Sequence, residues 1–279
     1  MEKQPLVSVI LPVFNAERFL RPAIDSVLNQ TYRHLELIIV DDCSEDNSLC
    51  IANEYANIDS RVLVESNPAN LKLSSTLNRA ISLSSGKYLA RMDADDISAP
   101  TRVEKQVRAM EENQDLVVVG CDIAIIDQNN HSIGFRRYRG IDKEIRKWLF
   151  FFSPFCHPAI MIRQKAIDDV GGYNNYFNPA EDYELYFRLG TVGNFMNIKE
   201  ELFTYRIVGN SMTHGTTLSM EEKTIEIRDK YRNSYHMPFL ARIYNLIHKL
   251  SLRHVSPVTR IKLYNFYRQN LFRKTTLCN

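Results

Sequence analysis

Two hydrophobic patterns alternate along the first two hundred residues. Short runs of β-branched and other apolar residues, typical of buried strands, are followed by stretches whose apolar residues recur at three- and four-residue steps, as in amphipathic helices. This alternation predicts an α/β fold in which helices flank a central sheet. The expected strands are residues 6–13, 35–40, 61–65, 87–92, 116–119, 123–126 and 159–162, and the expected helices are residues 16–30, 46–56, 74–83, 100–112 and 181–189.

Two acidic clusters fall at the ends of expected strands. Asp41 and Asp42 end the second strand, and Asp93, Asp95 and Asp96 directly follow the fourth. In open α/β sheets, ligands bind beyond the carboxyl ends of the strands. The sequence therefore predicts a binding site at this edge of the sheet.

Each cluster has a chemical interpretation and a structural one. Asp93 and Asp95 offer the oxygen ligands that Mg²⁺ and Mn²⁺ prefer, or else they form a solvated turn that caps the helix starting near Pro100. Asp42 can accept hydrogen bonds from a nucleotide base or ribose, or it belongs to a helix-capping segment.

Glu181 and Asp182 open the last expected helix of this region. A carboxylate placed there can take the proton of an acceptor hydroxyl, although the helix dipole alone favours acidic residues at this position. His157 precedes a proline and a strand, where a neutral imidazole lines a sugar pocket or makes a structural hydrogen bond.

Composition narrows the class of protein. The 279-residue chain has 44% hydrophobic and 24% charged residues, which is typical of globular proteins. The five cysteines are scattered and form no C-x-x-C pair, so neither a disulfide framework nor a zinc site is expected. The sequence has no uninterrupted apolar run of 18 residues and no signal-peptide pattern, which predicts a cytoplasmic protein that does not span the membrane.

The last fifty residues form a separate electrostatic region. Residues 231–279 contain nine Lys or Arg and no Asp or Glu. Residues 238–255 and 257–272 have the pattern of basic amphipathic helices, which bind the inner, anionic face of the cytoplasmic membrane or pack against the catalytic domain or a second subunit. We expect a catalytic domain at residues 1–219 and a helical tail at residues 220–279. No nucleic-acid-binding motif is present.

The segments that carry these features resemble the family 2 glycosyltransferases. The resemblance runs from about residue 5 to residue 213, and its motifs occur in the family's order at residues 7–15, 26–32, 36–44, 86–96, 157–158 and 181–185. It implies the GT-A fold, with a mixed, mainly parallel sheet and a C-terminal helical extension. It also implies transfer of a hexosyl or N-acetylhexosaminyl group, with inversion, from a nucleoside-diphosphate sugar. UDP-sugars are the expected donors, with Mn²⁺ or Mg²⁺ as cofactor.

The resemblance also implies a role for individual residues. Pro12, Phe14 and Asn15 border the nucleoside, Asp42 holds the base, Asp93 lies near the ribose and the metal, and Asp95 ligates the metal. Asp182 is the general base, and Glu181 helps to orient the sugar or the acceptor. In addition, His157 lines the donor-sugar pocket, Arg206 contacts the diphosphate and His214 completes the metal shell.

Processive members of the family carry a Gln-x-x-Arg-Trp motif and transmembrane helices, whereas the only tryptophan here is Trp148. We therefore expect transfer of one sugar per encounter, to a saccharide or lipid-linked saccharide of bacterial polysaccharide or glycolipid synthesis. A glycine-rich phosphate loop is missing after the first strand, which disfavours a nucleotidyltransferase or a dinucleotide-dependent oxidoreductase. The remaining alternative is a catalytically silent sugar-nucleotide-binding or scaffold protein.

Overall fold

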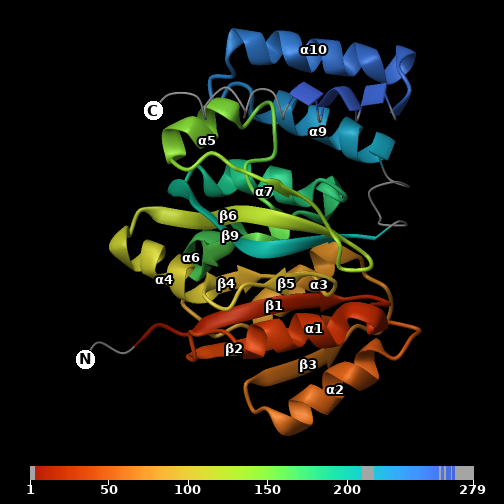
Figure 1. Cartoon of the computed structure of the whole chain (residues 1–279). Helices are drawn as coiled ribbons and strands as arrows, with labels where there is room; N and C mark the ends of the chain where they lie inside the picture. The colour runs from red at the N-terminus through yellow and green to blue at the C-terminus, as the bar shows by residue number, and fades with distance from the viewer. Residues whose placement is uncertain (1–3, 209–216, 258, 261, 265, 268–279) are drawn as a thin grey trace.

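The computed structural model describes residues 4–208 and 217–267, with the exception of residues 258, 261 and 265. One sheet runs through the catalytic part in the order β3-β2-β1-β4-β8-β6-β9-β5, and β7 pairs with β6 outside this path. Figure 1 shows helices on both faces of the sheet and the C-terminal helices stacked beyond one side. The sheet is mixed, as the sequence predicts.

The first half of the sheet is parallel and built from βα units. Its strands are β1 (Val7–Val13), β2 (Leu35–Asp41), β3 (Val62–Ser66) and β4 (Tyr88–Arg91). They are connected by α1 (Glu17–Leu28), α2 (Ser48–Ile58) and α3 (Leu73–Leu83). In the register of β1 and β2, Val13 lies opposite Asp41, so both acidic clusters come to the same edge of the sheet.

The second half of the sheet contains β5 (Ile97–Ser98), β6 (Leu116–Asp127), β7 (Ser132–Arg136), β8 (Met161–Arg163) and β9 (Asn194–Ile207). Around it lie α4 (Arg102–Glu112), α5 (Asp142–Trp148), α6 (Gln164–Val170) and α7 (Glu181–Leu189), and the short 3₁₀ helices η1 (His157–Ala159) and η2 (Asn175–Phe177). β8 is antiparallel to β4 and β6, and it joins the two halves.

Apolar cores lie on both faces of the sheet. One core packs α1, α2 and α4 against β1 and β2, and the other packs α3, α6 and α7 against the opposite face. Strands covered on both faces need apolar residues at nearly every position, which explains the hydrophobic run of residues 37–40 within β2.

One expectation about the strands was wrong. Residues 116–119 and 123–126 form a single strand, β6, with an irregular register around Asp122. The buried Asp122 carboxylate accepts a hydrogen bond from the Tyr138 backbone and forms ion pairs with Arg137 and Lys199. A charged residue in an apolar run suggests a strand end, but tertiary partners neutralise it here.

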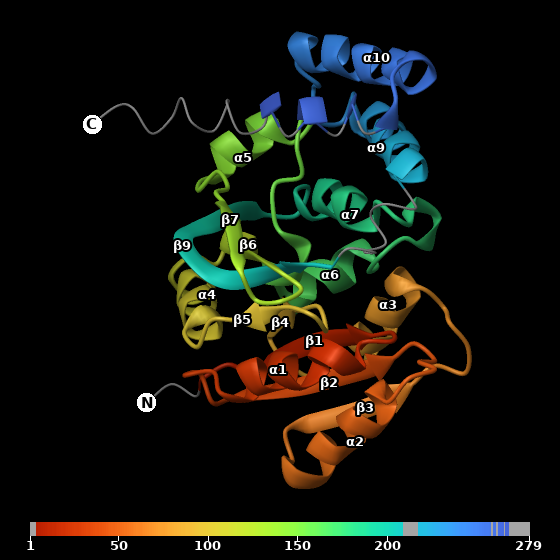
Figure 2. The ribbon, with the colours of Figure 1, turned by 45° about the vertical axis from the view of Figure 1, so that its right-hand side comes forward.

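The C-terminal part adds α9 (Thr217–Tyr231) and α10 (Phe239–His254). α9 contacts α7 and α10 contacts α9, so the helices form successive layers on one side of the catalytic part (Figure 2). The expected division at residue 219 falls within α9 and stays a prediction. Among the residues that the structure describes, no helix is both long and apolar enough to cross a bilayer.

Candidate active site

Three carboxylates converge where β4 ends. The side-chain oxygens of Asp93, Asp95 and Asp96 lie within 4.8 Å of one another. Just before them, Arg91 is 2% exposed, and its Nη2 makes an ion pair of 2.6 Å with Asp93 Oδ1. The turn after β4 therefore gathers three negative charges beside one buried cation.

The pKa values of two of these carboxylates are raised, because the side chains are buried and lie close to one another. Burial, and then the charge of Asp93, raise the pKa of Asp95 to about 6. The same causes raise the pKa of Asp96 well above its ordinary value. Asp96 Oδ1 accepts a 2.7 Å hydrogen bond from the Arg206 backbone, and its buried Oδ2 has no partner among the described residues.

These features fit a divalent cation. Asp93 and Asp95 are partly accessible, whereas Asp96 is buried and already holds the start of β5 against β9. A hard cation binds oxygen ligands and would relieve the mutual repulsion that raises the pKa of Asp95. The donor set therefore suits Mg²⁺ or Mn²⁺, with Asp93 and Asp95 as the available ligands.

Arg91 links this cluster to a second acidic pair. Its charge lowers the pKa of Asp95 and Asp96 and also that of Glu181 and Asp182, against the larger upward effect of burial. Its Nε and Nη1 are buried without a partner within the described part of the chain. The sequence assigned no role to Arg91, although an arginine in an otherwise apolar strand is an unusual residue that marks the position.

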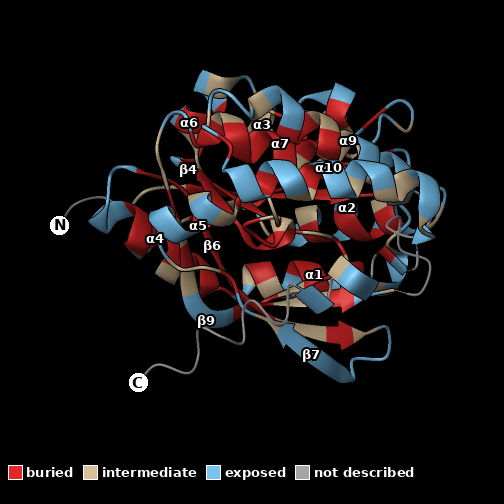
Figure 3. Cartoon of the chain, turned by 90° about the horizontal axis from the view of Figure 1, so that it is seen from above, coloured by how far each residue is buried: buried red, intermediate tan, exposed pale blue. Residues whose placement is uncertain are grey.

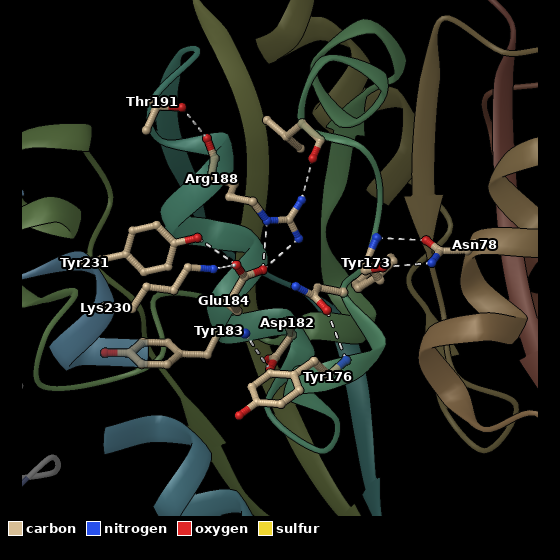
Figure 4. A network of polar contacts seen from close by, with 12 residues as sticks. Asn78, Tyr173, Tyr176, Asp182, Tyr183, Glu184, Arg188, Thr191, Lys230 and Tyr231 are labelled. Carbon is tan, nitrogen blue, oxygen red and sulfur yellow. Dashed lines mark hydrogen bonds and ion pairs between the residues drawn. The ribbon is translucent and has the colours of Figure 1, made fainter. Parts of the chain in front are cut away.

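The second pair lies at the start of α7. Glu181 is 4% exposed, and burial together with the charge of Asp182 raises its pKa to about 7. Asp182 Oδ1 accepts a 2.7 Å hydrogen bond from the Tyr183 backbone, and burial raises the pKa of Asp182 as well (Figure 4). Two carboxylates with raised pKa values in one place are characteristic of sites that exchange protons.

His157 opens η1 and is held close to Tyr173. Burial, and then the charge of Arg91, lower its pKa well below the ordinary value. Its Nε2 lies 2.7 Å from the hydroxyl of Tyr173, whose backbone pairs with Asn78 of α3 (Figure 4). This contact agrees with the structural hydrogen bond that the sequence left open, and Tyr173 is a site residue that the sequence analysis missed.

Glu184 connects helix α7 to the C-terminal helix α9. Its fully buried carboxylate accepts hydrogen bonds from Arg188 on the same helix and from Lys230 and Tyr231 on α9 (Figure 4). α9 thereby fixes the helix whose first turn carries Asp182.

The loops after β1 and β2 are joined to each other. Asn15 Oδ1 accepts from the Glu45 backbone at 2.8 Å, and the Asn15 backbone donates to Ser44 Oγ at 3.0 Å. Asn15 has a positive φ of 49°, which asparagine tolerates well. Pro12 is buried in β1, whereas Phe14 is 48% exposed.

Asp42 lies in the predicted region, but its carboxylate already accepts hydrogen bonds from other residues of the protein. Its oxygens accept from Asn67 Nδ2 at 2.7 Å, from Leu71 N at 2.8 Å and from Lys72 N at 2.9 Å. It therefore fixes the loop between β3 and α3. The neighbouring Asp41 has a buried Oδ1 that lacks a partner in the described chain.

Arg206 also supports the site through the backbone. Its Nε donates to the Asp95 carbonyl at 2.7 Å, and its Nη1 donates to Asn130 Oδ1 at 2.6 Å. The guanidinium stacks over Phe19 at 4.5 Å from the ring centre. In this structure Arg206 thus holds the turn that carries Asp95. His214 lies outside the described residues.

The parallel half-sheet, joined through β8 to a mixed half, has the GT-A fold of solved glycosyltransferase structures. The family model described as "Glycosyl transferase family 2" matches residues 8–171. The chain belongs to this family.

Relatives and solved structures agree with this assignment. An uncharacterized glycosyltransferase of Haemophilus influenzae is 30% identical over 96% of this chain and 87% of its own length. The O-antigen biosynthesis glycosyltransferase WbnJ of Escherichia coli is 34% identical, over 86% of this chain and 94% of its own.

Two solved structures share the fold at low sequence identity. S. aureus TarS in complex with UDP-GlcNAc superposes with a TM-score of 0.68 at 17% identity, over 81% of this chain and 66% of the TarS chain. The mannosyltransferase PcManGT of Pyrobaculum calidifontis, in complex with GDP-Man and Mn²⁺, has a TM-score of 0.62 at 15% identity, over 100% of this chain and 77% of its own.

Proposed function

We propose that this glycosyltransferase moves one sugar from a UDP-sugar to an acceptor hydroxyl, in a metal-dependent reaction that inverts the anomeric carbon. The observation that carries the proposal is that two pairs of carboxylates share one buried arginine as a neighbouring charge. Asp93 and Asp95 on one side, and Glu181 and Asp182 on the other, all lie within the electrostatic influence of the buried Arg91.

The donor side uses the edge of the parallel half-sheet. The exposed ring of Phe14 suits stacking on a nucleotide base, and the loop that Asp42 fixes closes the same edge. TarS with UDP-GlcNAc and PcManGT with GDP-Man and Mn²⁺ show nucleotide-sugar donors on this fold, which supports a nucleotide-sugar donor here. A divalent ion held by Asp93 and Asp95 would neutralise charge on the diphosphate leaving group.

The acceptor side begins at α7. We assign Asp182 as the general base, because its carboxylate lies at a helix start and its raised pKa brings it closer to neutral pH. It takes the acceptor proton at its carboxylate oxygen while the acceptor oxygen bonds to the anomeric carbon and the diphosphate leaves. One displacement inverts that carbon. Glu181, buried beside it, orients the reacting sugar through hydrogen bonds.

The acceptor class follows from relatives and from the loop before α7. WbnJ acts in O-antigen biosynthesis, as its name states, and this supports a saccharide or lipid-linked saccharide acceptor. Tyr176 on η2 is 62% exposed next to α7, where an aromatic ring can stack on a sugar. Hexosyl or N-acetylhexosaminyl transfer, one unit per encounter, is the corresponding reaction.

The test uses purified protein, UDP-sugars, a saccharide acceptor and Mn²⁺, with release of UDP as the readout. Asp95→Asn and Asp182→Asn should each lose transfer, whereas Asp169→Asn, which alters an exposed ion pair on α6, should keep it. The coupling constant of the anomeric proton in the product, measured by NMR, reports inversion. Full transfer by Asp182→Asn would contradict the assigned base. A wild-type protein that binds donor but never turns over would favour the silent sugar-nucleotide-binding alternative.

A further inference from the structure

Large apolar residues of α10 face solvent, whereas in an ordinary surface helix such residues face the core. Ala241 and Asn245 are buried against the protein, and Asn245 donates a 2.9 Å hydrogen bond to Asp229 of α9. The large apolar residues instead face solvent. We call them the α10 apolar face: Phe239, Leu240, Ile243, Leu246, Ile247 and Leu250.

The α10 apolar face forms one continuous stripe. Its members recur at steps of three and four residues, which place side chains on the same side of an α-helix. Their exposed fractions range from 40% for Ile243 to 75% for Phe239. Figure 3, in which the molecule is seen from above, shows α10 crossing the face turned toward the viewer with much of its ribbon coloured as exposed. A contiguous apolar surface of this kind marks an interaction site.

Positive charge accompanies the stripe. Arg242, Lys249 and Arg253 are exposed on the same helix. The acidic residues of α9 that lie nearest are engaged within the protein, because Asp229 accepts from Asn245 and Glu221 accepts from Arg260 at 2.9 Å. Residues 231–279 contain no Asp or Glu at all.

We propose that the α10 apolar face docks on an anionic lipid bilayer, with the helix lying in the plane of the headgroups. Apolar side chains enter the acyl boundary, and the flanking cations pair with lipid phosphates. A second copy of the chain fits this face less well, because two copies of α10 would bring six cations together without an acidic partner.

Docking would connect the membrane to the active site through α9. Lys230 and Tyr231 of α9 bind the Glu184 carboxylate of α7, and α10 packs on α9. The bilayer would then lie on the side of the molecule from which α7 is anchored. This arrangement suits a lipid-linked acceptor, but the docking inference rests on α10 alone and not on the proposed reaction.

The experiment is co-sedimentation of the full chain with large unilamellar vesicles. Vesicles that mix phosphatidylglycerol with phosphatidylcholine should bind the protein, and vesicles of phosphatidylcholine alone should bind it weakly. The double variant Leu246→Asp/Ile247→Asp should lower the partition coefficient at least about tenfold. The triple variant Arg242→Gln/Lys249→Gln/Arg253→Gln should lower it on the order of a hundredfold on anionic vesicles.

A control is Ile58→Asp, at an exposed apolar position at the end of α2 that is 78% accessible. It should bind vesicles like the wild type. Circular dichroism confirms the fold of each variant, and transfer to a soluble acceptor should be unchanged by the α10 substitutions, which separates this inference from the proposed reaction.

Two outcomes overturn the proposal. The first is equal binding of wild type and both α10 variants to anionic vesicles. The second is a dimer in analytical ultracentrifugation that Leu246→Asp/Ile247→Asp dissociates, together with no vesicle binding, because the α10 apolar face would then be a contact between copies.

Discussion

Replacing Glu184 with Gln should loosen the helix that carries the proposed base. The carboxylate is fully buried and accepts from Arg188, Lys230 and Tyr231 at 2.6 to 2.9 Å. Glutamine keeps one acceptor oxygen but removes the charge, and it turns an amide donor toward a cation. Loss of one partner of a buried ion pair costs about 3–5 kcal/mol. Lys230 is partly exposed, so we expect about 2–4 kcal/mol.

The assay combines thermal unfolding with pH. A loss of this size should lower Tm by about 4–8 °C in a protein of this length. Burial alone would raise the pKa of Glu184, but hydrogen bonds from Arg188, Tyr231 and Lys230 lower it overall. The ionised form therefore stabilises the fold above the ordinary glutamate pKa, and this contribution disappears as pH falls through the lowered value. The wild-type and Glu184→Gln curves should converge in acid.

The same variant should separate anchoring from catalysis. Asp182 lies one turn or less from Glu184, so transfer should fall while donor binding at Asp93 and Asp95 persists. Asp169→Asn, which breaks an exposed pair with Lys165, should change Tm by less than about 2 °C. An unchanged Tm for Glu184→Gln at neutral pH would refute the reasoning.

Three further predictions concern single residues. Glu181→Gln should raise the free energy of unfolding at pH 8 by about 1–3 kcal/mol, because the buried carboxyl has a raised pKa of about 7 and folding disfavours its ionised form above its unfolded pKa. The gain should vanish below pH 4, and pH-dependent urea unfolding without added metal measures it. Tyr176→Ala should raise the acceptor KM about tenfold with little change in donor KM, since in our proposal its ring contacts the acceptor and not the donor. Steady-state kinetics with each substrate varied separates the two constants, and equal effects on both would contradict the assignment. Arg206→Lys should weaken cation binding, because lysine cannot span the Asp95 carbonyl and Asn130 together. Titration with Mn²⁺ measures this affinity, and an unchanged value would show that the turn needs no guanidinium.

Local patterns predict those elements whose signals are local. α7 spans Glu181–Leu189 as expected, and α10 lies within the expected helix at residues 238–255. β9 was missed, because its alternation is broken by register shifts against β6 and its polar residues find partners in distant parts of the chain. Asn197, for example, is buried, and its Nδ2 donates hydrogen bonds to the carbonyls of Arg139 and Pro154.

The sequence predicted the edge of the sheet at which the candidate carboxylates lie, but not the contacts that several of them make. Strand ends locate Asp93 and Asp95, since the carboxyl ends of parallel strands share one edge, whereas Asp182 is located by the start of an expected helix. The direction of each side chain depends on contacts from remote segments, as for Asp42, which turns to the loop after β3, and Arg206, which holds the Asp95 carbonyl. Such contacts leave no periodic signal in the sequence.

The most direct test of the central claim is calorimetric titration of UDP and UDP-sugars into the wild type, Asp95→Asn and Asp182→Asn, with Mn²⁺ and with EDTA. We predict nucleotide binding that requires the cation, is lost in Asp95→Asn and is retained in Asp182→Asn. Binding that is equal in EDTA, or equal in Asp95→Asn, would contradict a donor site built on the carboxylates after β4.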